Sequence, residues 1–106
     1  MKWLMLLVCT SVTAWGQLAS SVLLGEIRDE SSAVVPGAEV VATHEPTGFA
    51  RSTTSNSSGS YRMEQLMPGL YRVTVGKPGF RLVRIENVRL EVNQKAGLDV
   101  VLPVSW

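Results

Sequence analysis

Apolar and polar residues alternate in short runs along most of this chain, and this alternation predicts β-strands. The clearest run is 71–75, where Tyr71, Val73 and Val75 fall on one face while Arg72 and Thr74 fall on the other. Similar patterns predict strands at 21–29, 38–44, 49–54 and 98–102. Residues 81–85 and 88–92 fit either two short strands or one strand bent around 86–87.

Turn residues separate these runs. Three Pro-Gly pairs lie at 36–37, 68–69 and 78–79, and the polar stretch 55–59 ends in Gly59. Proline fixes φ near −65° and glycine accepts positive φ, so Pro68-Gly69 suits the centre of a type II turn. No window shows sustained helical periodicity, and residues 63–67 fit one helical turn at most.

About seven short strands with turns every 8–12 residues predict a single antiparallel β-sandwich from about residue 20 to residue 104. The stretch 55–75 is its centre, with Tyr61 and Tyr71 facing inward. The apolar face opposite this stretch is expected from five residues: Ile27, Val40, Leu90, Val100 and Leu102. The strand 49–54 is polar and is expected near an edge, where Arg51 discourages pairing with another sheet.

Length and charge narrow the function classes. A chain of 106 residues holds one domain, and 45% hydrophobic with 18% charged residues is an ordinary globular balance. Lys and Arg total 10 against 9 Asp and Glu. This near-neutral balance provides no basic surface for nucleic acid or for an anionic membrane.

The first 16 residues have the features of a secretory signal peptide. Lys2 precedes an apolar run, and Ala14-Trp15-Gly16 places small residues at −3 and −1 before Gln17. The run is too short for a transmembrane helix, so no membrane-spanning segment is expected in the mature chain. Removal of 1–16 also removes Cys9, the single cysteine, so the exported domain would depend on core packing without disulfides.

Candidate chemistry is sparse. His44 is the single histidine, at a strand end where a surface or turn position is expected, and no second His or Cys completes a zinc site. The serines therefore lack a credible base for a catalytic triad. Asp29, Glu30 and Glu45 would have to meet at one end of the sandwich to bind calcium, and they lack the regular loop spacing. We expect no enzyme activity, no cofactor and no metal.

The order of motifs resembles a known family. The segments that carry the resemblance are Gly25–Asp29, Ala33–Val40, Thr47-Gly48, Asn56–Tyr61, Leu66–Tyr71 and Pro78–Phe80. They resemble the carboxypeptidase regulatory-like domain, a transthyretin-like β-sandwich grouped with carbohydrate-binding-like folds. The particular residues in these motifs look like those of the domain found after the signal peptide of Oar-like TonB-dependent outer-membrane receptors. The plug and barrel of such receptors would have to follow Trp106, so transport is not carried over.

This resemblance implies a non-enzymatic, exported accessory or interaction module of the cell envelope. Its location would be periplasmic, outer-membrane-associated or extracellular, and its partner an envelope protein, a receptor barrel or a polysaccharide. Loops 29–37, 45–49 and 55–59 are candidate contact regions, because loops on a rigid scaffold usually carry recognition. The alternative is a carbohydrate-binding module, with Phe49 and Phe80 beside turns as its candidate contacts.

Overall fold

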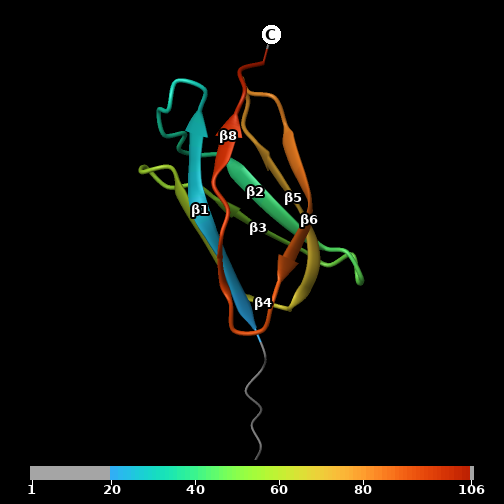
Figure 1. Ribbon diagram of the computed structural model, residues 1–106. Helices are drawn as coiled ribbons and strands as arrows, with labels where there is room; N and C mark the ends of the chain where they lie inside the picture. The colour runs from blue at the N-terminus through green and yellow to red at the C-terminus, as the bar shows by residue number, and fades with distance from the viewer. Residues whose placement is uncertain (1–19, 106) are drawn as a thin grey trace, which may run out of the picture.

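Two β-sheets pack face to face as a sandwich (Figure 1). The computed structural model describes residues 20–105, and within this range every regular element is a strand. The strands are β1 (Ser21–Asp29), β2 (Glu39–His44), β3 (Ala50–Thr54), β4 (Ser60–Leu66), β5 (Gly69–Gly76), β6 (Val83–Leu90), β7 (Lys95–Gly97) and β8 (Val100–Leu102). The predicted all-β sandwich is confirmed. The proposed signal peptide, 1–16, lies outside the described residues.

One sheet has the order β3-β2-β5-β6, with β3 at its edge as predicted, and its strands are antiparallel. In the other sheet β1 pairs antiparallel with β4 but parallel with both β7 and β8. The sandwich is therefore not antiparallel throughout. After β6 the chain crosses to the second sheet beside the start of β1, where Val22 N–H donates to Gln94 O at 2.9 Å. From there it can only run alongside β1 in the same direction.

The core lies between the sheets and follows the predicted alternation. The five residues expected to face the 55–75 stretch are all at most 3% exposed: Ile27, Val40, Leu90, Val100 and Leu102. Tyr61 and Tyr71 point inward, with exposures of 4% and 2%. Among residues 20–105, no helix is long and apolar enough to cross a membrane.

The helical turn considered for residues 63–67 is wrong, because this segment is the end of β4. Met63 pairs with Leu23, but Leu66 pairs with Ser21, so the register shifts by one residue between them. Gln65 has φ 59° and accommodates this bulge. The bulge lets Met63 and Leu66 both reach the core at a three-residue spacing, which in sequence resembles a helix.

A second bulge decides the form of β6. Tyr71 pairs with Val88 and Val73 with Ile85, so two residues of β6 oppose one of β5. Asn87 has φ 60° at this point. The structure therefore has one bulged strand at 83–90 in place of two short strands. The strand stops before Val92, which was predicted to continue the alternation but is 54% exposed.

Candidate functional site

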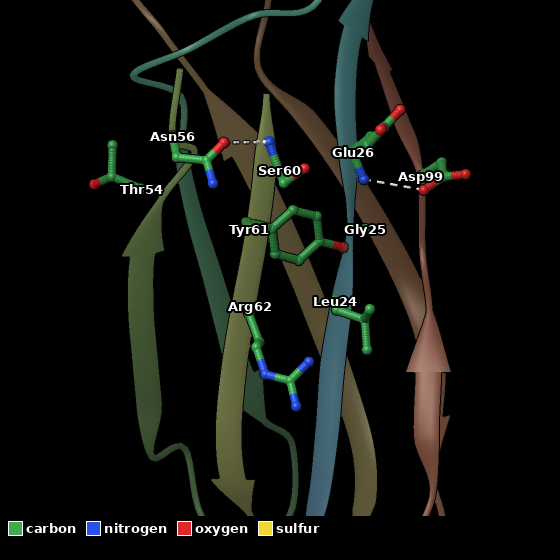
Figure 2. A pocket seen from close by; sticks show the side chains of 9 residues that line it. All are labelled: Leu24, Gly25, Glu26, Thr54, Asn56, Ser60, Tyr61, Arg62 and Asp99. Carbon is green, nitrogen blue, oxygen red and sulfur yellow. Dashed lines mark hydrogen bonds between the residues drawn. The ribbon is translucent and has the colours of Figure 1, made fainter. Parts of the chain in front are cut away.

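A groove of about 620 Å³ lies where the end of β3 and the following loop meet β4, β1 and the β7–β8 junction. Figure 2 shows its lining, which consists of Leu24, Gly25, Glu26, Thr54, Asn56, Ser60, Tyr61, Arg62 and Asp99. This volume suits a small ligand of one or two rings.

Close approach of two backbones builds the floor of the groove. A Cβ placed on Gly25 would lie 2.0 Å from Leu98 O, so glycine is needed there. The Tyr61 hydroxyl donates a hydrogen bond to the same carbonyl, and in Figure 2 the Tyr61 side chain extends from β4 toward Gly25. Leu98 N–H in turn donates to Leu24 O at 2.8 Å. These contacts hold the β7–β8 junction against β1.

At this junction the side chain of Asp99 supplies the hydrogen-bond acceptor that a backbone carbonyl of a neighbouring strand would otherwise provide. Its Oδ1 accepts a hydrogen bond from Glu26 N–H at 3.0 Å, between the pairings of β7 and β8 with β1. Burial, and secondarily the nearby negative charge of Asp99, raises the pKa of the Tyr61 phenol. Tyr61 is therefore a neutral donor at ordinary pH, and Asp99 is held in place through one of its two oxygens.

Asn56 organises the opposite wall through a local turn. Its side-chain oxygen accepts from Ser58 N–H at 2.9 Å and from Ser60 N–H at 3.0 Å, while its own N–H donates to Ser60 O at 2.9 Å. Gly59 has φ 77°, and a Cβ there would lie 2.8 Å from Ile27 O. The position of Asn56 is thus set by several backbone contacts.

The free edge of β4 is partly closed to another strand. Gly59 O accepts from Ile27 N–H at 2.7 Å, so alternation turns the backbone groups of Ser60, Arg62 and Glu64 away from β1. Asn56 binds both backbone groups of Ser60, and the Arg51 guanidinium donates to the carbonyls of Glu64 and Gln65 at 3.1 and 3.2 Å. Arg51 was predicted to discourage sheet pairing at the edge of its own strand, β3, whereas its guanidinium lies across the edge of β4 in the other sheet.

The charges of the groove are partly compensated by neighbours. Glu26 pairs with Arg28 at 2.9 Å, and Arg62 pairs with Glu64. The bond from Arg62 lowers the pKa of the Glu64 carboxyl. Because these side chains are 43–59% exposed, the pairs contribute little to stability and leave both guanidinium groups accessible to water.

Phe49 and Phe80, the contacts predicted for a carbohydrate, lie at opposite ends of the same sheet. Phe49 follows the His44 end of β2 and is 58% exposed, whereas Phe80 follows the Gly76 end of β5. In the register of β2 and β5, Glu39 pairs with Gly76 and His44 with Tyr71. Phe80 also packs against the core and bridges to Val104. The two rings therefore do not form one platform.

The predicted contact loops separate in the same way. Loops 29–37 and 55–59 lie together, where Gly37 N–H donates to Ser55 O at 3.0 Å. Loop 45–49 lies at the other end of β2. In loop 29–37, Asp29 accepts hydrogen bonds from the Ser31 hydroxyl and from the N–H groups of Ser31 and Ala33, and these bonds lower the pKa of its carboxyl. This carboxylate therefore stabilises its own turn.

His44 was expected at the surface or in a turn, and this expectation is wrong. It is 6% exposed, with Nδ1 2.8 Å from Thr47 Oγ1 and Nε2 3.1 Å from Pro68 O. Its ring meets Tyr71 edge-on at a centroid distance of 5.1 Å. Gly69 has φ 139°, outside the range of a type II turn, and a Cβ on it would lie 2.7 Å from Nε2. The ring of His44 thus holds the β4–β5 connection.

The acidic residues do not assemble as a calcium site. Asp29 ends β1 beside loop 55–59, while Glu45 lies at the far end of β2 and pairs with Arg72 at 3.2 Å. Among residues 20–105 there is no group of three or more His, Cys, Asp or Glu side chains placed to hold a metal ion.

Of the groove residues, only Asn56 lies in a loop that was predicted as a contact region. The sequence Asn56-Ser-Ser-Gly59-Ser60 signals a turn whose asparagine bonds to the following backbone, which is a usable sign. Gly25 and Asp99 could not be found in this way, because their roles depend on a contact between segments about 73 residues apart.

Comparisons with known proteins agree with this architecture. The model of the carboxypeptidase regulatory-like domain family matches residues 22–103. No curated protein matches the sequence.

Among solved structures, the fold is similar to hydroxyquinol 1,2-dioxygenase from Pseudomonas putida, with TM-score 0.65, 9% identity and coverage of 87% of this chain and 59% of that one. It is similar to a putative carbohydrate binding protein from Bacteroides uniformis, with TM-score 0.64, 15% identity and coverage of 77% and 40%. It is also similar to the TIE protein of Bacillus anthracis, with TM-score 0.64, 20% identity and coverage of 81% and 17%. The chain spans less than two thirds of each of these three proteins, and at such identities the likeness concerns the fold.

Proposed function

Since this chain belongs to the carboxypeptidase regulatory-like domain family, we propose that it acts as a non-catalytic binding module of the cell envelope. The observation that carries this proposal is the state of His44. It is the single histidine of the chain, and both of its ring nitrogens already hold structural contacts in a buried position. The one imidazole is therefore committed to holding the β4–β5 connection, which favours a scaffold role for His44 over a role as the base of a catalytic serine.

The proposed setting is the one implied by the receptor resemblance. The leader at 1–16 directs export, and the sandwich then presents loops 29–37 and 55–59 to an envelope protein, such as a receptor barrel. These two loops support the proposal because they lie together and are tied to the framework by backbone hydrogen bonds. Ordered loops bind with a smaller loss of conformational entropy.

We expect the full chain, expressed in its native host, to appear outside the cytoplasm with Gln17 as its first residue. A photo-reactive amino acid at Ser31, in loop 29–37, should cross-link it to one envelope protein. The same group at Arg89, on β6 in the opposite region of the sandwich, is the control and should not. Mass spectrometry of the product and N-terminal sequencing provide the measurement. An unprocessed cytoplasmic protein, or equal cross-linking from both positions, contradicts the proposal.

A second candidate function is carbohydrate binding. Phe49 is 58% exposed beside a turn, which allows its ring to stack on a sugar, and Phe80 is the other candidate contact. One protein of similar fold is described as a putative carbohydrate binding protein. On this candidate, polysaccharide embedded in a native gel should retard the domain, and comparison with Phe49→Ala tests whether that ring is the contact. Unchanged mobility in every polysaccharide tested would count against carbohydrate binding altogether.

A further inference from the structure

We propose that the groove on β1 and β4 binds a neutral saccharide unit, through Asn56 and Asp99 on its opposite walls. This inference rests on the second candidate function, carbohydrate binding, and places its site away from Phe49 and Phe80. The argument starts from how these two polar side chains are held.

Asn56 and Asp99 are each fixed through one atom. The oxygen of Asn56 is occupied by two backbone N–H groups, so its amide nitrogen is oriented as a hydrogen-bond donor. Oδ1 of Asp99 is occupied by Glu26 N–H, so Oδ2 remains as an acceptor. Among the described residues, neither the Asn56 nitrogen nor Asp99 Oδ2 makes a hydrogen bond with a side chain or backbone group. Figure 2 shows the Asn56 and Asp99 side chains on either side of β4 and β1.

A groove with a held donor on one wall and a held acceptor on the other suits hydroxyl groups, because each hydroxyl both donates and accepts. Ser60 adds a hydroxyl between the two walls, and Leu24 adds an apolar surface for the C–H face of a ring. The side chains are already ordered, so a ligand would lose little affinity to their immobilisation. A groove of about 620 Å³ accommodates one or two sugar rings.

The charges of the groove select against other ligand classes. Glu26 and Asp99 outnumber Arg62 in the lining and so disfavour anionic ligands such as phosphate esters. An extended peptide is also disfavoured, since peptides that bind at sheet edges depend on pairing with main-chain groups. On β4 the main-chain N–H and C=O groups of Ser60 are hydrogen-bonded to Asn56. The carbonyl of Glu64 accepts a hydrogen bond from Arg51. A neutral polyhydroxylated ligand fits these features of the groove.

Two near-isosteric substitutions test the proposal without removing the scaffold bonds. Asn56→Asp keeps an oxygen for the N–H groups of Ser58 and Ser60 but replaces the donor nitrogen with an acceptor. Asp99→Asn keeps an oxygen for Glu26 N–H but removes the charge and the second acceptor. Each should weaken binding of neutral gluco-, manno-, galacto- or N-acetylglucosamine oligosaccharides at least tenfold, as measured by calorimetry on the mature domain. Unchanged melting temperatures would establish that the fold is intact. Glu86→Gln, an isosteric change at an exposed position of β6 in the other sheet, is the matched control and should bind like the unsubstituted domain.

Amide chemical shifts in the presence of the oligosaccharide locate the ligand independently of any variant. Changes should gather at Glu26, at 56–62 and at 98–99. Binding that survives both groove variants, is lost in Phe49→Ala and shifts residues 45–49 would overturn the groove site while leaving carbohydrate binding in place. Absence of binding to every saccharide, or binding of extended peptides alone, would overturn the groove site and the carbohydrate-binding candidate together.

Discussion

Replacing Gly25 with alanine should destabilise the domain by about 3 kcal/mol, the upper end of the usual range for overpacking a folded core, because the atoms that the new Cβ meets are rigid backbone. The new Cβ would lie 2.0 Å from Leu98 O and 2.6 Å from Leu98 C. These are backbone atoms, so relief requires the β7–β8 junction to move away from β1. That movement breaks the hydrogen bonds that Leu98 makes with Tyr61 and Leu24.

The matched control for this prediction is Gly97→Ala. Gly97 pairs with Leu24 in the same part of the sheet, but nothing lies within 4 Å of a Cβ placed there and its φ is not positive. Urea unfolding followed by circular dichroism measures both variants. Gly97→Ala should change stability by less than about 1 kcal/mol, the scale of a surface change. If Gly25→Ala unfolded at the same urea concentration as Gly97→Ala, the proposed backbone contact would be refuted.

Removal of the Tyr71 side chain should cost about 3–5 kcal/mol, the range for truncating a buried aromatic ring to alanine. Tyr71 is 2% exposed, its ring contacts His44, and its hydroxyl donates to Met67 O at 2.6 Å. The ring therefore joins the core to the β4–β5 connection. Burial raises the pKa of its phenol, which keeps the hydroxyl protonated as a donor at ordinary pH.

Tyr71→Phe separates the ring from its hydroxyl and should cost only about 1 kcal/mol, the net value of a hydrogen bond of this kind. Differential scanning calorimetry of the two variants provides the comparison. Equal losses for Tyr71→Phe and Tyr71→Ala would mean that the bond to Met67, and not the packed ring, is responsible for the stabilisation.

His44 illustrates how the surroundings of a residue can be misjudged from the sequence. The absence of a partner in sequence argued against catalysis and zinc binding, but the same pattern suggested a surface position. The structure buries the ring between Thr47, Pro68 and Tyr71. A strand end looks exposed in sequence, whereas here the β4–β5 connection folds over it.

The bulges in β4 and β6 show a related limit of periodicity. Each inserts one residue, so the alternation changes phase inside a strand. In β4 this made 63–67 look helical. In β6 the change of phase meant that the sequence pattern fitted one bent strand and two short strands equally well. Gln65 and Asn87 have positive φ at these points, but neither residue type is enough to predict a bulge from the sequence.

The sequence alone determined the all-β class, the inward set of residues and the edge position of β3, because alternation and turn residues are local properties of the chain. The tertiary structure decided the parallel pairing of β7 and β8 with β1, the burial of His44, the separation of Phe49 from Phe80, and the groove. All of these depend on register between strands distant in sequence. The bond between Glu26 and Asp99 joins residues 73 positions apart, and it exists because the chain closes the second sheet beside β1. No local pattern encodes that closure.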